Sequence, residues 1–413
     1  NNSYLYPALS SSFVFTNIMK GMDFLSFGKL RAGWAQVGND TDPYRLINTY
    51  VTGNPYGNTS VFSVDDALKN ANLKPETVVN IETGLDLRFL NDRIGLDFTL
   101  YKVNTYDQII ALPVSSTTGF ESLIVNAGEM ENKGVEVMLS GTPIQGESFS
   151  WDINLNAARN KNKVLELAEG QDNFELGGRD GTNTVNATVG QPYGTIIAPN
   201  VIYDEASGKP IVGSNGFYLR NPGEIVGSIM PDYTGGVSNS FTYKGVRLSA
   251  LIDFQAGGEF WAETIQNGIA NGQFIESVGL NDRGVRMRDP VVDGGGIKAD
   301  AVFENGEPNT IYLEAQDYFK QLYSLDGLSI YDASYIKLRE VSIGYSLPNR
   351  IAKKLSLNGV SFSVFSRNVA ILYKNVPHID PSEIALGSDN VQGLEGASIP
   401  SPRMVGFNIN LKL

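Results

Sequence analysis

The 413-residue sequence predicts an all-β chain that forms a transmembrane antiparallel β-barrel. Three observations lead to this prediction. Apolar and polar residues alternate over stretches of about ten residues, as in strands that face lipid on one side and a hydrated interior on the other. The chain is rich in glycine, tyrosine and phenylalanine, which suits turn-rich β structure. It contains no apolar run of about 18 residues, the length that a membrane-spanning helix requires.

The alternation is clearest in 94–101, 148–157 and 405–413. In the last of these, Val405 and Phe407 share one face of the strand and Gly406 and Asn408 the other, because successive side chains point to opposite faces. Extending the pattern along the chain predicts eleven strands. They lie at 7–17, 26–38, 78–90, 93–108, 127–143, 148–163, 231–243, 246–258, 330–346, 357–372 and 401–413.

The connections between these strands alternate between short and long. The short ones are 18–25, 91–92, 144–147, 244–245 and 347–356, and the long ones are 39–77, 109–126, 164–230, 259–329 and 373–400. Asn91-Asp92 and Lys244-Gly245 suit two-residue hairpins, because Asn, Asp and Gly tolerate positive φ. Outer-membrane barrels have short periplasmic turns and long extracellular loops. We therefore expect the long connections to face the outside of the cell.

Two irregularities are expected near the end of the chain. In 330–346, Ile336 and Leu338 lie in one phase and Val341 and Ile343 in the other, which predicts a β-bulge near Glu340. In the following turn, Pro348 stands at a position that suits the start of a short periplasmic helix.

Composition excludes several classes of function. The net charge of -13 opposes binding to nucleic acid. The absence of cysteine excludes disulfides and cysteine-ligated metals. The single histidine, His378, stands near Asp380 and Ser382, but a lone histidine in a long loop is more often a surface residue than a catalytic base. We therefore predict that the chain is not an enzyme.

No cofactor is required by these patterns, and the nature of any metal site stays open. Asp40 and Asp42 alternate as in a calcium-binding loop, but Tyr44 and Arg45 stand where further oxygen ligands and a turn glycine would be needed. A looser calcium site among acidic loop residues is the alternative.

Several segments resemble the SusC/RagA family of TonB-dependent outer-membrane transporters from Bacteroidetes. The resemblance rests on the order and spacing of these segments along most of the chain. They include KLRAGWAQVGND at 29–40, NIETGLDLRFLNDRIGLDFTLYKVNTYDQII at 80–110, NAGEMENKGVEVML at 126–139, PDYTGGVSNSFTYKG at 231–245, YIKLREVSIGYSLP at 335–348, SRNVAILYK at 366–374 and the ending PSPRMVGFNINLKL.

Members of that family have an N-terminal domain, a TonB box, a plug and a barrel of 22 strands. The resemblance therefore implies that 1–413 is the C-terminal portion of the barrel, with about eleven of 22 strands, and that the other three parts are absent from this chain. It also implies location in the outer membrane, in contact with lipid, with the plug and with the other half of the barrel.

The resemblance further implies active import of an oligosaccharide or a peptide, in a complex with a SusD-like surface lipoprotein and energised by TonB. A dimer of this complex is a further expectation. The alternative is a passive porin, whose barrel would show the same alternation without needing a plug. The sequence also leaves open an outer-membrane hydrolase and a soluble glycan-binding β-protein.

The longest connection, 259–329, is the best candidate for contact with substrate or partner. Acidic residues outnumber basic ones in it, and 260–270 and 314–323 have helical spacing. Ordered loops of this length usually have a function. We predict that Trp261 and Tyr318 contact substrate or partner, because large amphipathic rings dominate binding surfaces. The alternative is that such rings form the loop's own core, which we favour most for Phe274.

Overall fold

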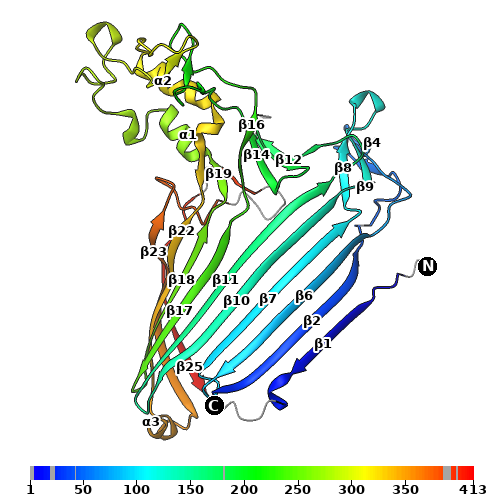
Figure 1. Ribbon diagram of the computed structural model, residues 1–413, viewed down its shortest axis with the longest axis vertical. Helices are drawn as coiled ribbons and strands as arrows, with labels where there is room; N and C mark the ends of the chain where they lie inside the picture. Colours follow the sequence, from blue (N-terminus) through cyan, green and yellow to red (C-terminus); the bar gives the residue numbers. More distant parts are fainter. Residues whose placement is uncertain (1–3, 19–23, 42, 180–181, 385–391, 397–398) are drawn as a thin grey trace. The chain divides into compact units, whose positions relative to one another are not determined.

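The computed structural model describes residues 4–18, 24–41, 43–179, 182–384, 392–396 and 399–413. The chain divides into two compact units. One comprises Asn1–Phe174 and Thr188–Pro192, and the other Glu175–Ala187 and Tyr193–Leu413. Long antiparallel strands dominate both (Figure 1).

The first unit contains six long strands, each hydrogen-bonded to the next in chain order. They are β1 (Ala8–Val14), β2 (Leu25–Asn39), β6 (Glu76–Phe89), β7 (Ile94–Tyr106), β10 (Glu129–Gln145) and β11 (Phe149–Glu166). These are the six strands predicted from the alternation in this part of the sequence. The prediction for 7–17 was too long, because Phe15–Asn17 forms a 3-10 turn. This turn places the Phe15 ring beside Gly28, where a Cβ would lie 2.3 Å from the ring.

The second unit contains the other five predicted strands. They are β17 (Tyr233–Tyr243), β18 (Val246–Ala256), β22 (Tyr335–Ser346), β23 (Gly359–Lys374) and β25 (Met404–Lys412). The predicted strand 330–346 is in fact two. Its first residues form β21 (Ile330–Asp332), which pairs with β19 (Glu259–Ala262) in a separate small sheet, and β22 begins only at Tyr335.

The predicted bulge is confirmed one residue from its expected place. Leu338 pairs with Ile252 and Glu340 with Leu251, so that Arg339 is the extra residue. The bulge corrects the phase of the strand, because Val341 and Ile343 then share a face with Ile336 and Leu338.

The turns agree in part with the sequence. Lys244 and Gly245 have φ values of 46° and 90°, and they close a two-residue hairpin between Tyr243 and Val246. The other predicted two-residue hairpin was wrong. Phe89 pairs with Ile94, so four residues form that turn, three of which have positive φ. The short helix expected after Pro348 is present as α3 (Asn349–Lys354).

The long connections fold into short elements. In the first unit these are β3 (Tyr50–Thr52), β4 (Phe62–Val64), β5 (Ala67–Leu68), β8 (Ile109–Pro113), η2 (Ser116–Thr118) and β9 (Ser122–Asn126). Further along the chain they are β12 (Asn173–Arg179), β13 (Asn183–Thr188), β14 (Tyr193–Ala198), β15 (Ile211–Val212), β16 (Glu224–Ser228), α1 (Glu263–Ala270), η3 (Ile275–Ser277), η4 (Val291–Asp293), β20 (Val302–Phe303), α2 (Ala315–Gln321), η5 (Leu322–Ser324), η6 (Asp326–Ser329) and β24 (Leu394–Glu395).

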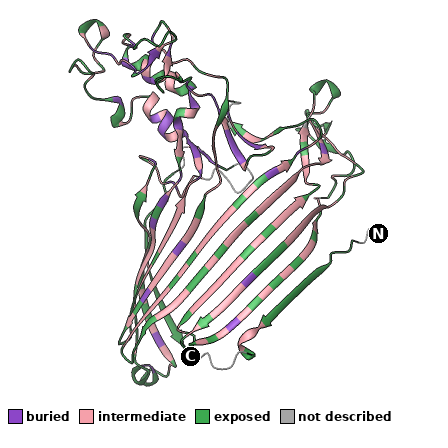
Figure 2. Cartoon of the chain, in the orientation of Figure 1, coloured by how far each residue is buried: buried purple, intermediate pink, exposed green. Residues whose placement is uncertain are grey.

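The long strands of each unit form a sheet that we call the wall. Each wall has an apolar face and a polar face. In the first unit, Leu30 pairs with Leu85, which pairs with Phe98, so that these side chains share one face. On the opposite face, Arg31 makes two hydrogen bonds to Asp97 of 2.8 and 2.7 Å. Exposed positions recur along the long strands, and fully buried ones are few in them (Figure 2). No helix of the described residues is long and apolar enough to cross a membrane.

Candidate functional site

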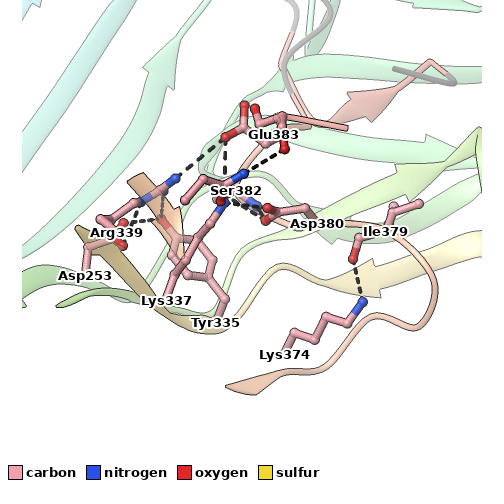
Figure 3. A network of polar contacts seen from close by, with 11 residues as sticks. Asp253, Tyr335, Lys337, Arg339, Lys374, Ile379, Asp380, Ser382 and Glu383 are labelled. Atoms are coloured by element: carbon pink, nitrogen blue, oxygen red, sulfur yellow. Dashed lines mark hydrogen bonds and ion pairs between the residues drawn. The ribbon is translucent and has the colours of Figure 1, made fainter. Parts of the chain in front are cut away.

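A fully buried lysine marks the polar face of the second unit. Lys337 lies on β22 between Ile336 and Leu338, and its side chain is 0% exposed. An isolated ammonium group would be costly at such a position, so it must be paired. Its Nζ contacts the carboxylate of Asp380, donates a hydrogen bond of 2.9 Å to Ser382 Oγ, and lies 3.8 Å from Glu383 Oε1. Figure 3 shows these partners converging on it.

A second cation extends this group. Arg339, the bulged residue, donates a hydrogen bond of 2.7 Å to Asp253 Oδ1 and lies 3.6 Å from Glu383 Oε1. The hydroxyl of Tyr335 donates a hydrogen bond of 3.1 Å to the other oxygen of Asp253. Two cations and three carboxylates are thereby joined in one network across β18, β22 and the segment 380–383 (Figure 3).

The network fixes the protonation state of its loop carboxylate. Burial raises the pKa of Asp380, but hydrogen bonds from Lys337 and Ser382 lower it more, so the pKa is below its ordinary value. Asp380 is therefore ionised at neutral pH. Nearby, Lys374 Nζ donates a hydrogen bond of 2.7 Å to the carbonyl of Ile379. Two lysines on the strands thus hold the segment 375–384 at the ends of β22 and β23.

A hollow of about 720 Å³ adjoins this network. Charged side chains from both strands and loops line it, together with apolar ones. The charged or titratable residues are Lys374, His378, Asp380, Glu383, Glu395 and Arg403. Such a lining can bind a polar ligand through ion pairs and hydrogen bonds. We take this hollow and the network beside it as the candidate site.

His378 does not form a catalytic group with its neighbours in the sequence. Its Nε2 lies 2.7 Å from Glu276 Oε1, and its ring stacks on Phe274 at a centroid distance of 4.0 Å. Asp380 and Ser382 are instead engaged with Lys337. Phe274 also packs against the cluster of Phe260 and Ile265, which agrees with the core role that we favoured for it.

The two predicted contact residues lie outside the hollow. Trp261 is on β19, only 4% exposed, and packs with Val185 and Leu394. Tyr318 is on α2 and half-buried, and its hydroxyl lies 3.1 Å from that of Tyr218. Both rings contribute to the internal packing of the loops, and a contact with substrate or partner stays a prediction for each.

The calcium alternative also stays a prediction. Asp42 lies outside the described residues, and Asp40 Oδ1 accepts a hydrogen bond of 2.9 Å from the backbone N–H of Thr41. Among the residues that the structure describes, no group of three or more histidine or acidic side chains is placed to hold a metal ion.

Sequence reasoning missed Lys337 as a central residue. The local signal was a lysine at a polar-phase position of an alternating strand, which is ordinary in a barrel. Its partner Asp380 is 43 positions away, and no local pattern joins the two. The one available hint was that 378–383 concentrates polar side chains around Pro381.

Comparisons with known proteins agree with this architecture. Residues 1–286 match the family described as TonB dependent receptor-like, beta-barrel. The TonB-dependent receptor P3 of Formosa agariphila is 25% identical over 100% of this chain and 42% of its own length. The TonB-dependent receptor SusC of Bacteroides thetaiotaomicron is 27% identical over 96% of this chain and 38% of its own length.

Solved structures show the same fold. The RagAB peptide importer in its closed-closed state matches 98% of this chain and 43% of its own chain, with a TM-score of 0.72 and 20% identity. The chain thus spans about two fifths of the length of the relatives it matches. The family match covers well over half of the chain, and the strand alternation, the two-faced walls and the fold agree with it. The resemblance seen in the sequence is confirmed: the chain belongs to the TonB-dependent receptor β-barrel family and is part of an outer-membrane barrel.

Proposed function

We propose that the protein containing this chain imports a nutrient oligomer, an oligosaccharide or a peptide, across the outer membrane. Import would be active, driven by TonB and assisted by a SusD-like surface lipoprotein. The chain would contribute barrel wall and loops, and the plug and the rest of the barrel would come from the other part of the protein.

One observation carries this proposal. A hollow in the second unit is lined by charged and apolar side chains, beside a network of two basic and three acidic side chains. A polar oligomer needs hydrogen-bond and ion-pair partners along its route, and convergent polar groups in a concave site supply them. The ordered fold of 259–329 supports a role for this loop in forming the entrance.

The relatives support the class of substrate and partner. One relative is named for SusC, and a solved structure of the same fold is described as a peptide importer of two components, RagAB. These names describe those proteins. For the present chain, an oligomeric substrate and a capping lipoprotein are proposals, as are a dimer of the complex and a calcium ion bound in a loop.

Uptake in whole cells tests the mechanism. Cells expressing the full-length receptor should accumulate labelled oligosaccharide or peptide, and accumulation should stop when TonB is deleted. Uptake that continues at an unchanged rate without TonB would favour the alternative, a passive porin.

The loop can be tested separately. Deleting 262–311 should abolish uptake or association with the lipoprotein, while the barrel keeps its heat-modifiable migration. As a finer test, Arg403→Glu reverses an exposed charge that lines the hollow and should weaken uptake, and Lys412→Glu is the matched control outside it. Normal uptake by the deletion and by Arg403→Glu would remove both features from the mechanism.

A further inference from the structure

Four exposed lysines gather on one face of three neighbouring strands in the first unit. Lys133 of β10 pairs in register with Lys102 of β7 on one side and with Lys161 of β11 on the other. Residues paired across antiparallel strands point to the same face. Lys163 lies two positions beyond Lys161 and therefore shares this face as well. We name Lys102, Lys133, Lys161 and Lys163 the lysine patch.

The lysine patch lies on the apolar face of the wall. On β7, the positions in phase with Lys102 are Ile94, Leu96, Phe98 and Leu100. On β10, the positions in phase with Lys133 include Val135, Val137 and Leu139. The opposite face carries Asp97, Tyr101 and Asn160, joined by polar contacts to one another or to neighbours. In an outer-membrane barrel the apolar face contacts lipid.

On β7 and β10, the patch follows directly after a run of apolar positions on the lipid-facing side. Lys102 is the next outward residue after Leu100 on β7, and Lys133 the next after Val135 on β10. Lys102 lies four residues before the end of β7 and Lys133 four residues after the start of β10, and both of these strand ends continue into long connections. With the long connections outside, this is the level at which the acyl chains of the outer leaflet give way to headgroups.

The charges of the patch are only partly balanced by the protein. Glu131 lies 2.7 Å from Lys102 and 2.9 Å from Lys133. Glu129, also nearby, accepts a hydrogen bond of 3.2 Å from Asn104. In the part of the chain that the structure describes, Lys161 and Lys163 have no acidic side chain within ion-pair distance. Like charges on directly opposed positions destabilise a sheet, so the row of lysines is better explained by an anion that contacts it.

We propose that the lysine patch binds the phosphate of an anionic lipid headgroup in the outer leaflet. Neighbouring strands lie about 5 Å apart, so three lysines in one row span about 10 Å, a width that suits one or two phosphate groups. Long lysine side chains extend from an apolar surface toward headgroups. A lipid satisfies both parts of the surface, because its acyl chains cover the apolar positions while its phosphate reaches the ammonium groups. A soluble phosphate would leave the apolar positions uncovered.

Binding of a phosphorylated lipid to the purified full-length receptor tests this proposal. The double substitution K161E/K163E removes the two lysines without an acidic partner. A lysine near an anionic lipid surface contributes about fivefold in affinity, so the variant should bind phosphorylated lipid A at least about 25-fold more weakly in native mass spectrometry. K161R/K163R should retain binding. The matched control K353E/K354E makes the same charge change at two exposed lysines of α3 and should bind like the wild type.

Further binding measurements distinguish a lipid phosphate from free phosphate. Dephosphorylated lipid A should bind all forms of the receptor weakly and equally. Inorganic phosphate alone should show no binding that depends on Lys161 and Lys163. Heat-modifiable migration will confirm that each variant is folded, and K161Q/K163Q replaces the charge reversal should it fail to fold. Unchanged binding of phosphorylated lipid by a folded variant would overturn the proposal, as would equal binding of the dephosphorylated lipid or tight binding of inorganic phosphate by the patch.

Discussion

Within the second unit, the wall strands and the loop region 259–334 differ in that only the loop region builds an apolar core of its own. On β25, Val405 is 71% exposed and Phe407 is 78% exposed. In the loop region, Phe260 on β19 and Ile265 on α1 are both fully buried. The difference is explained by the solvent around each region, which is lipid for the wall and water for the loops. The wall leaves apolar groups on its surface because lipid covers them, and the loop region forms a buried apolar core because water surrounds it.

The network of Lys337 lies where the wall strands join the loops. It joins a wall strand to the loop segment 375–384 through the fully buried Lys337 and the mostly buried Asp380. Removing one partner of a buried ion pair leaves the other charge buried without compensation. The loss of stability should therefore be larger than for an exposed pair, whose remaining charge is solvated by water.

The largest effect is expected from Lys337→Met. It leaves Asp380 buried beside Ser382 without its cation, which should destabilise the attachment of 375–384 by about 3–5 kcal/mol. Hydrogen exchange of this segment in the full-length receptor measures the effect. Lys337→Met combined with Asp380→Leu removes both charges and should recover much of the loss. A double variant as unstable as the single one would show that the ion pair is not the cause.

The same attachment should depend on pH. Because the pKa of Asp380 is lowered in the folded protein, its contribution is complete above the ordinary carboxyl value of about 4 and is lost as the pH falls through the lowered pKa. Protection of 375–384 from exchange should therefore be constant between about pH 5 and 8 and should fall below about pH 4. A loss of protection near neutral pH would show that a group other than Asp380 determines the pH dependence.

Phe260→Ala should affect the loops and spare the wall. The side chain is fully buried against Ile265 and Val376, so the cavity should destabilise the loop region by about 3–5 kcal/mol. Limited proteolysis should then cut within 259–334 while heat-modifiable migration is retained. Tyr323→Ala, at an exposed ring of the same region, is the control and should be neutral. Loss of the folded barrel in Phe260→Ala would show that the two regions are not independent.

Ile343→Arg should instead destabilise the wall and spare the loops. Ile343 is 54% exposed on the apolar face of β22, and an arginine that faces lipid costs up to about 2–4 kcal/mol, with the full cost at the bilayer midplane and less toward the interfaces. Unfolding in bilayers should show this loss. Leu280→Arg places the same residue at an exposed apolar position of the loops and should change stability little. Equal losses of stability at Ile343 and Leu280 would contradict the conclusion that lipid surrounds the wall and water surrounds the loops.

The smallest effect is expected at an exposed ion pair of the wall. Arg367 Nε lies 2.8 Å from Glu340 Oε2, and both side chains are partly open to solvent. Arg367→Ala should change the free energy of unfolding by no more than about 1 kcal/mol. A loss of stability as large as that of Lys337→Met would show that burial does not determine how much an ion pair contributes in this protein.

The sequence by itself determined the strands. Their alternation is a property of each segment, because a period of two follows from the backbone alone. For the same reason the Lys244-Gly245 hairpin and the bulge beside Glu340 were predictable, since turn residues and a change of phase are visible within a few positions. The helical spacing in 260–270 and 314–323 was likewise sufficient to predict α1 and α2.

Only the tertiary structure decided which partner each segment has. The residues Ile330–Asp332 continue the chain into β22, yet they pair with β19, because the loop region offers them an apolar core. Lys337 is a central residue only because the fold brings Asp380 to it, and Trp261 is buried only because Val185 and Leu394 pack around it. Local patterns report the period and the turns of a chain, but burial and ion pairing depend on residues far apart in sequence, and those contacts exist only in the folded protein.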